Sequence, residues 1–216
     1  MKTSRVKRSH GPKSVMTENT YRKKALPFLL KDFEKKCAYC LDPNDFRIPS
    51  HDQVDHFNCK LRGRNRHYYK NLMLGCAACN HSKHDKPLVN PFDTEQRLLN
   101  CTEENEFIGH IKEEADGQWV ALSKAGEYHL ESIGLTVDCH RKKRQERRKM
   151  IERIVSLFTT AVHYRTENPE AVHNELMATI RMLMDTLDKF PPLVTGNGVF
   201  TARDWLKSKG VDLSLI

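Results

Sequence analysis

The chain has 216 residues, of which 38% are hydrophobic and 30% charged, and its formal net charge is +8. This length suits one domain or two small ones, and no run approaches the roughly 18 consecutive apolar residues of a membrane helix. The basic N-terminus has no apolar stretch behind it, so we expect no secretory leader, no membrane contact and a cytoplasmic location. Apolar residues recur in periodic blocks, which excludes a fully disordered chain.

Charge is distributed unevenly along the chain. Residues 1–36 carry a net charge of +8, residues 37–90 carry +3 and residues 141–166 carry +7, whereas residues 91–140 carry −8. Basic segments attract nucleic acid, so the two strongly positive segments are candidates for holding it. We expect the acidic segment to face away from a nucleic acid or to contact a partner.

Hydrophobic periodicity and turn residues predict the elements in chain order. Residues 1–19 are polar and basic, and we expect a flexible arm. The remaining pattern predicts a helix over 20–36, short strands over 53–57 and 71–74, a helix over 79–86, a hairpin over 106–123, and helices over 137–165, 169–190 and 201–209. The chain therefore divides into the arm over 1–19, a core over 20–90, and a hairpin plus helical region over 91–216.

Four of the seven cysteines form two C-x-x-C pairs with 35 residues between them: Cys37 with Cys40, and Cys76 with Cys79. Zinc binds four thiolates in a tetrahedron, and each C-x-x-C turn supplies two of them. In a chain without a leader this spacing predicts a structural zinc site, with two redox-active or unrelated pairs as the alternative. We expect the remaining cysteines to be part-buried and inert: Cys59, Cys101 and Cys139.

A group of polar residues lies between and after the cysteine pairs. Asp55-His56 ends one short apolar run, Asn71 lies 15 residues after His56, and Asn80 lies 9 residues after Asn71. The D-H pair, the N-L pair and the run CAACNHSK resemble the HNH endonucleases, also called ββα-metal nucleases. The upstream C-x-x-C matches the zinc-stapled branch of that family, and the resemblance spans residue 37 to about residue 86.

This resemblance implies a metal-dependent nuclease and gives each residue a role. His56 would be the general base, Asp55 and Asn80 would hold Mg²⁺ or Mn²⁺, and Asn71 would brace the loop that carries His56. These residue types fit the chemistry, because an imidazole accepts a proton near neutral pH and carboxylate and amide oxygens are hard ligands. His84 is a less favoured metal ligand, one helical turn beyond Asn80.

Basic side chains near this group are candidates for phosphate contacts. The loop after the D-H pair carries basic residues beside two tyrosines: Lys60, Arg62, Arg64 and Arg66. This composition suits phosphate binding and base stacking, or a merely solvated loop. Lys83 shares a helix face with Asn80, and we expect it to contact phosphate. We expect His51 and His67 to be solvent-exposed loop residues.

A second basic run opens the helix predicted over 137–165. Seven of the nine residues over 141–149 are basic, and they include Arg141, Lys142, Lys143 and Arg144. At 100° per residue they surround most of a helix, so they cannot all face a core. A nucleic-acid contact and a solvated face are equally good predictions for this run.

Segments after the core support a finer resemblance. The stretches KPLVNPFD, LLNCTEE, ESIGLTVDCHRKKR and GVFTARDWL are similar to the small HNH subunit of bacterial Septu-type anti-phage systems. That resemblance implies a nuclease effector controlled by an ATPase partner, in some systems beside a retron reverse transcriptase. Apolar helix residues would then dock the partner or form the protein's own core: Leu176, Ile180, Leu183 and Leu187.

The sequence thus predicts an α+β fold with a zinc-stapled ββα-metal core, a small β-hairpin and a mainly helical C-terminal region. The predicted activity is hydrolysis of phosphodiester bonds in DNA, with RNA as the alternative substrate. The rival predictions are a zinc-ribbon module that binds nucleic acid without cutting it, and an accessory subunit that needs a partner.

Overall fold

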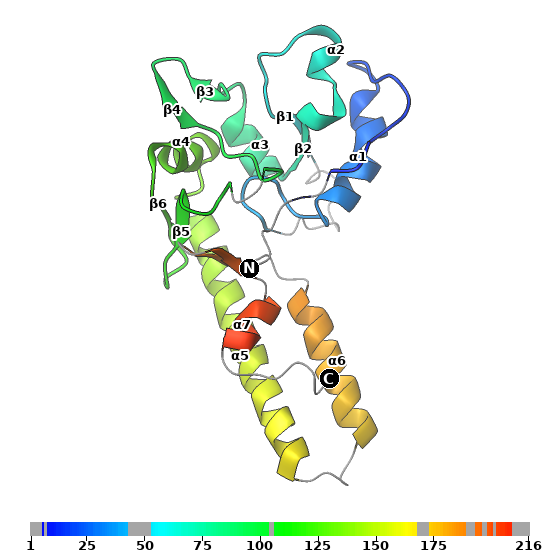
Figure 1. The fold of residues 1–216 in the computed structure, drawn as a ribbon, viewed down its shortest axis with the longest axis vertical. Coiled ribbons are helices and arrows are strands. Elements are labelled where there is room, and N and C mark those ends of the chain that lie inside the picture. Colours follow the sequence, from blue (N-terminus) through cyan, green and yellow to red (C-terminus); the bar gives the residue numbers. More distant parts are fainter. Residues whose placement is uncertain are drawn as a thin grey trace.

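The computed structural model describes residues 6, 8–42, 53–103, 106–167, 173–188, 193–195, 198–200 and 202–208. Its helices combine with small antiparallel sheets of two strands each, which confirms the α+β prediction. Figure 1 shows the elements up to residue 133 gathered in the upper part of the molecule, with long helices extending below them. Among the described helices, none is both long and apolar enough to cross a membrane.

The centre of the upper part is a pair of strands followed by a helix: β1 (Gln53–His56), β2 (Leu72–Gly75) and α3 (Ala77–Lys83). The strands are antiparallel, with Asp55 opposite Met73 and His56 opposite Leu72. α3 begins after Cys76, whose sulfur accepts a backbone N–H from the first turn of the helix. Both strands and the helix agree with the predicted ranges to within a few residues.

One helix covers this sheet, and two short turns connect its strands: α1 (Tyr21–Asp32), α2 (Gly63–Arg66) and a 3₁₀ turn (Tyr69–Asn71). α1 packs against β2 and buries Tyr21, Ala25 and Leu29, which recur every fourth residue and so share one face. This spacing explains why the helix was predictable from the apolar pattern.

The described part of the N-terminal arm is bonded to the core. The Val6 N–H donates to the Cys101 carbonyl, and the Arg8 guanidinium donates to the Leu72 carbonyl at 2.8 Å. The same guanidinium lies 4.5 Å from the centre of the Tyr69 ring, a cation–π contact. Arg8, one of the basic residues of the arm, is therefore bonded to the core. The flexible arm expected over residues 1–19 is not what the structure shows at Val6 and Arg8.

Two hairpins and a helix complete the upper part: β3 (Val89–Asn90) with β4 (Asp93–Arg97), β5 (Ile111–Glu113) with β6 (Trp119–Ala121), and α4 (Lys124–Ile133). The β5–β6 pair confirms the predicted hairpin. α4 was not predicted from the sequence. The Ser123 side chain caps its start by accepting the Gly126 N–H, and Gly134 ends it in a left-handed conformation. α4 packs against β4, β6 and α3.

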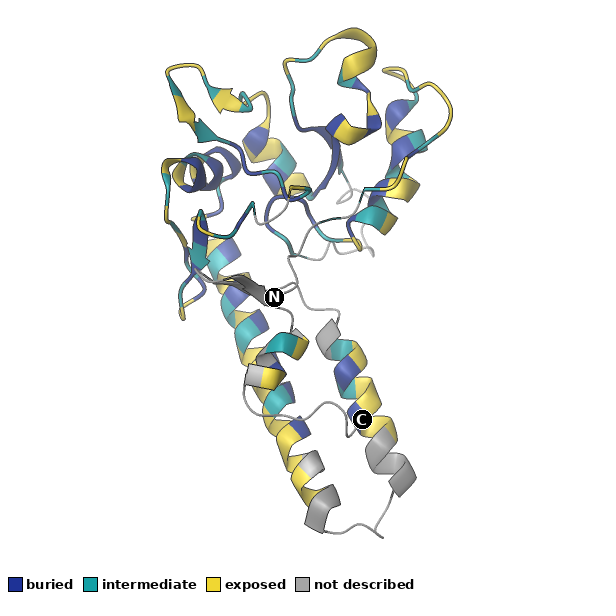
Figure 2. Ribbon diagram, in the orientation of Figure 1, coloured by how far each residue is buried: buried dark blue, intermediate teal, exposed yellow. Residues whose placement is uncertain are grey.

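Three helices and a strand pair follow: α5 (Asp138–Glu167), α6 (His173–Asp188), β7 (Leu193–Thr195) with β8 (Gly198–Phe200), and α7 (Ala202–Ser208). α5 and α6 contact each other, and Phe158 of α5 and Ile180 and Met184 of α6 are buried. Much of the far half of α5 is exposed in Figure 2. Ile180 is thus part of the protein's own core and Leu183 is half-buried, whereas the side chains of residues 176 and 187 lie outside the described set.

Candidate functional site

The four paired cysteines converge, as the spacing predicts. The Sγ atoms of Cys37, Cys40, Cys76 and Cys79 all lie within 4.8 Å of one another, and three of these cysteines are buried. Zn–S bonds of about 2.3 Å place tetrahedral sulfurs about 3.8 Å apart, so the cluster fits a four-thiolate site. The thiols hydrogen-bond one another, which lowers the pKa of Cys76 and raises the pKa of Cys40, while hydrogen bonds and burial raise that of Cys79, so that without a metal the cluster shares its protons unequally.

The other cysteines differ from one another. Cys101 is buried, Cys59 is half-buried and Cys139 is exposed. The prediction of a part-buried residue is therefore wrong for Cys139, which lies on the solvent side of the first turn of α5.

Asp55 is buried at the middle of β1 and has two side-chain partners. The Tyr39 hydroxyl and the Lys83 ammonium both donate to its Oδ2 atom, the latter at 2.9 Å. Burial raises the pKa of Asp55, and the positive charge of Lys83 opposes that shift. Neither of these two bonds involves Oδ1, and a backbone hydrogen bond at His56 also stabilises the charged carboxylate.

Lys83 does not lie on the surface. Its side chain is 0% exposed, and Nζ donates to the His56 carbonyl at 2.8 Å as well as to Asp55. The predicted phosphate contact of Lys83 is therefore wrong in this structure. A lysine three residues beyond Asn80 shares its helix face, but that face packs against β1.

His56 follows Asp55 and lies in an aromatic environment. The Tyr21 ring is 4.7 Å from the His56 ring, and His56 Nε2 lies 3.2 Å from His67 Nδ1. Burial, reinforced by the positive charge of Arg66, lowers the pKa of His56 to about 4. The imidazole is therefore neutral at neutral pH, the state in which it accepts a proton.

His67 is not the exposed loop residue that the sequence suggested. It is 8% exposed, and its Nε2 atom lies 3.0 Å from the Glu18 carboxylate. Its ring also stacks on Tyr21 at 4.9 Å. The hydrophobicity pattern could not reveal this, because the burial comes from a helix 46 positions earlier in the chain. The other histidine predicted to be exposed, at position 51, lies outside the described residues.

Asn71 connects two parts of the long loop between β1 and β2. Its amide nitrogen donates to the carbonyls of Asn58 and Arg66, at 3.2 and 2.9 Å, and its Oδ1 accepts the Asn58 N–H at 2.9 Å. The side chain uses both of its polar atoms on the backbone of this loop. Asn71 is therefore bonded to the segment that directly follows His56. These bonds are what the predicted role of bracing that loop requires.

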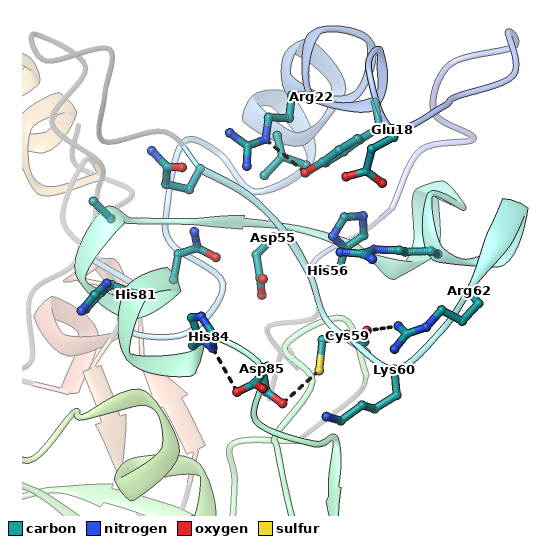
Figure 3. Close-up of a pocket in the computed structure, with 16 residues that line it drawn as sticks. Glu18, Arg22, Asp55, His56, Cys59, Lys60, Arg62, His81, His84 and Asp85 are labelled. Carbon is teal, nitrogen blue, oxygen red and sulfur yellow. Dashed lines mark hydrogen bonds and ion pairs between the residues drawn. The ribbon is translucent and has the colours of Figure 1, made fainter.

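A cavity of about 910 Å³ brings together the predicted D-H pair, Asn80, His84 and three residues of the basic loop. Asp55 projects from β1 toward its middle, with His81 and His84 to one side and Lys60 and Arg62 to the other (Figure 3). The polar and charged residues of its lining are Glu18, Tyr21, Arg22, Gln53, Asp55, His56, Cys59, Lys60, Arg62, Arg66, Asn80, His81, His84 and Asp85. Carboxylate, amide and imidazole groups thus face one space that has a basic rim.

The possible ligands beyond Asp55 come from α3. Asn80 is half-buried and lines the cavity, and its oxygen is a hard ligand that suits Mg²⁺ or Mn²⁺. His84 also lines the cavity, but it ends α3 at a φ of +41° and its Nδ1 lies 3.0 Å from Asp85. The donor set of Asp55 and Asn80 therefore fits a divalent cation, with His84 already bonded to a neighbouring carboxylate.

The basic loop lies beside this cavity. Lys60 and Arg62 are exposed and line it, Arg66 is half-buried and lines it, and Arg64 is exposed on α2. Arg22 of α1 adds a cation to the same rim that the sequence analysis did not single out. A nucleic-acid backbone approaching the cavity would meet these positive side chains.

The basic run of α5 has a different position. Arg144 is 0% exposed, its Nε donates to the Gly117 carbonyl at 2.6 Å, and its guanidinium lies 4.7 Å from the centre of the Trp119 ring. Arg141 pairs with Asp116, and the run therefore packs against the acidic hairpin. The predicted nucleic-acid contact is wrong for Arg144, whereas Lys142 and Lys143 are exposed.

Comparison with protein families agrees with this geometry. The model of the HNH endonuclease family matches residues 37–86, a range that contains all four paired cysteines, Asp55, His56, Asn71 and Asn80. Residues 37–86 are therefore similar to the HNH endonuclease domain, and members of that family are nucleases that use divalent metals. The comparison with curated proteins found no match. Glu18, Tyr21 and Arg22 contribute to the cavity from outside the matched range.

Proposed function

We propose that the cavity between β1, α3 and the basic loop is the active site of a metal-dependent endonuclease that hydrolyses phosphodiester bonds in DNA. The observation that supports this most strongly is the meeting of Asp55, His56 and Asn80 in one cavity with Lys60 and Arg62 at its edge. Hydrolysis needs a base, a cation that stabilises developing charge, and a phosphate-binding surface. His56 would be the base, Asp55 and Asn80 would hold the cation, and Lys60 and Arg62 would bind the phosphate.

Each side chain has a defined task in this proposal. Asp55 and Asn80 would hold Mg²⁺ or Mn²⁺, which acts as a Lewis acid at the scissile phosphate. His56 would remove the proton from the attacking water, and its low pKa keeps it unprotonated for that step. Asn71 would keep the loop after His56 in place through its three backbone bonds. Zinc at the cysteine cluster would have a structural role.

A wider assignment follows from the resemblance of the later segments. The protein would be the nuclease effector of a bacterial anti-phage system of Septu type, acting in the cytoplasm with an ATPase subunit and, in some systems, a retron reverse transcriptase complex. The support for this is the similarity of the segments after the core. The exposed residues of α5 would be available to such a partner.

The rival function is nucleic-acid binding without catalysis, or cutting only after a partner acts. One observation favours it: Lys83 and Tyr39 both bond to Oδ2 of Asp55, so half of the carboxylate is already engaged. In the nuclease proposal the cation uses the other oxygen or displaces Lys83.

Cleavage of supercoiled plasmid by the purified chain tests the proposal. We expect nicking or cutting in Mg²⁺ or Mn²⁺, none in EDTA, and a loss of at least about 100-fold in the Asp55→Asn variant, because a metal ligand is weakened while side-chain size is kept. Zinc content should match the wild type and shows that the domain is folded, whereas the melting temperature should fall, because the variant leaves the buried Lys83 without its carboxylate. Cleavage of equal rate by Asp55→Asn would overturn the assignment, and cutting only after addition of an ATPase partner would support the accessory role.

A further inference from the structure

A chain of hydrogen-bonding side chains leads from His56 to the surface. His56 Nε2 lies 3.2 Å from His67 Nδ1, and His67 Nε2 lies 3.0 Å from Glu18 Oε2. The two imidazoles are 7% and 8% exposed, whereas the Glu18 side chain is 65% exposed. The members come from β1, from the end of α2 and from the segment before α1, so only tertiary folding brings them together.

The direction of hydrogen bonding along this chain follows from the chemistry of its end. An ionised carboxylate only accepts, so His67 Nε2 must carry a proton and donate it to Glu18. In the neutral form of His67, Nδ1 is bare and accepts from His56 Nε2. In that form of the pair, His56 is protonated at Nε2 and bare at Nδ1. The Glu18 carboxylate thus selects a single tautomer of His56, with His67 between them.

The Tyr21 side chain holds both imidazoles in this arrangement. Its ring lies 4.7 Å from the ring of His56 and 4.9 Å from that of His67, and it is nearly parallel to the latter, at 23°. Tyr21 is 5% exposed and belongs to α1. The packing therefore limits the rotation of the rings, and the hydrogen bonds fix which nitrogen faces which partner.

We propose that His67 and Glu18 are positioning residues that hold His56 as the tautomer with a bare Nδ1, ready to take a proton from water. This inference rests on the proposed role of His56 as general base. Glu18 and Tyr21 precede the range that matches the HNH family, so the N-terminal helix completes the active site of the domain that follows it.

The tautomer of His56 can be measured without any cleavage. In ¹⁵N-histidine-labelled protein, a long-range ¹⁵N–¹H spectrum at neutral pH separates protonated from bare ring nitrogens, and a His56→Gln variant identifies the signals. We expect the wild type to show a protonated Nε2. His67→Phe keeps the ring stack but removes the acceptor, and we expect a mixture of tautomers. His67→Asn restores an acceptor near the Nδ1 position and should restore the single tautomer.

Cleavage kinetics give the second measurement. We expect His67→Phe to lower the rate constant for cutting by about 10–100-fold at unchanged DNA affinity, with partial recovery in His67→Asn and a smaller loss in Glu18→Ala. Glu152→Ala, an exposed carboxylate on α5, is the matched control and should cut as the wild type does. Glu18 is mostly exposed, so its variant should fold even if His67→Phe does not.

The outcomes separate the two proposals. A wild-type tautomer in both His67→Phe and Glu18→Ala would overturn the positioning role, whether or not the protein cuts DNA. If wild-type protein shows the expected tautomer and loses it in these variants but cuts no DNA, the positioning role stands and the nuclease proposal fails.

Discussion

Two arginine-rich stretches of this protein look alike in sequence and differ in the structure. The loop between β1 and β2 presents Lys60, Arg62 and Arg64 to solvent beside the cavity. The run that opens α5 directs Arg144 and Arg147 into the interior, at 0% and 6% exposure. The first set is available to a ligand, whereas the second is largely occupied by other parts of the chain.

The hairpin β5–β6 explains the difference. Glu113 is buried, and it accepts bonds from Arg147, Arg148 and the Trp119 indole. Glu113 and Asp116 of the acidic segment thus pair with the basic run that opens α5. The net charge of a segment can be read from the sequence. Whether its charged side chains pair with each other inside the protein or stay free for a ligand depends on the fold.

The largest predicted effect on stability comes from the cysteine cluster, whose two pairs flank the exposed loop in the sequence. Structural zinc supplies roughly 10–16 kcal/mol of apparent binding energy in small domains, so removal of one thiolate by Cys76→Ser should lower the free energy of unfolding by at least about 5 kcal/mol. Bound zinc, measured by elemental analysis, should fall from one ion per chain. Cys139→Ser, an exposed cysteine outside the cluster, should change neither quantity. Equal zinc content in the two variants would contradict the four-thiolate site.

The second largest predicted effect on stability comes from Glu113, the buried carboxylate that pairs with the basic run of α5. Glu113→Ala removes the nearer carboxylate of the buried Arg147 and leaves Asp42 at 3.8 Å, and breaking a buried pair costs about 3–5 kcal/mol of unfolding free energy. Glu114→Ala removes the neighbouring carboxylate, which is 46% exposed and pairs with Lys112 at the surface, and should cost less than about 1 kcal/mol. Chemical denaturation measures both. Similar costs would mean that the α5 run is not anchored by the hairpin.

DNA binding should separate the exposed residues of the two stretches. Each phosphate contact contributes a slope of about −0.9 to the dependence of log K on log salt. The double variant Arg62→Ala with Arg64→Ala should therefore make the slope shallower by about 2, and Lys142→Ala with Lys143→Ala should change it by less than about 1. Fluorescence anisotropy over a salt series provides the comparison. A larger change from the α5 pair would show that this helix, not the loop, binds the backbone.

The smallest effect concerns acid stability. His129 of α4 is 0% exposed, its Nδ1 accepts the Leu99 N–H at 3.1 Å, and burial lowers its pKa to about 4. The unfolded chain, with a pKa near 6.5, binds the proton more tightly, so stability is full above about pH 6.5 and falls as pH drops toward 4. As the pH falls from about 7.5 to about 5.5, His129 should therefore lower the free energy of unfolding by about 1 kcal/mol.

A denaturation series at both pH values tests this titration. His129→Asn keeps an acceptor for Leu99 but does not titrate, so its loss of stability over the same interval should be smaller than that of the wild type. An identical loss in the two proteins would assign the acid sensitivity to other groups.

Much of the fold was predictable because apolar residues recur at regular spacing. α1, α5, the strands beside Asp55 and the β5–β6 hairpin all follow from that pattern. α4 was missed because its buried face includes Gly126, His129 and Ser132, which do not read as apolar. Gly126 is required there, since an added Cβ would lie 1.9 Å from the His110 carbonyl oxygen. The short strands β3 and β7 offer too few residues for any period to appear.

The site was predictable to a different extent. The spacing of Asp55, His56, Asn71 and Asn80 between cysteine pairs was sufficient to group them, and the structure places three of them around one cavity. The wrong predictions concern the burial of polar residues, as for Lys83 and His67. A lysine or histidine is buried only when specific partners satisfy it, and those partners are distant in sequence. Periodicity alone does not reveal such pairs.

In the proposed function His56 takes part in cutting DNA, while other residues bind it. The most direct test measures binding and cleavage of one labelled DNA duplex by wild-type protein and His56→Ala in Mn²⁺, with zinc content as the control for folding. We predict an unchanged dissociation constant, within about twofold, and a fall in the cleavage rate of at least about 100-fold. Cleavage by His56→Ala at the wild-type rate, or a loss of binding equal to the loss of cleavage, would contradict the claim.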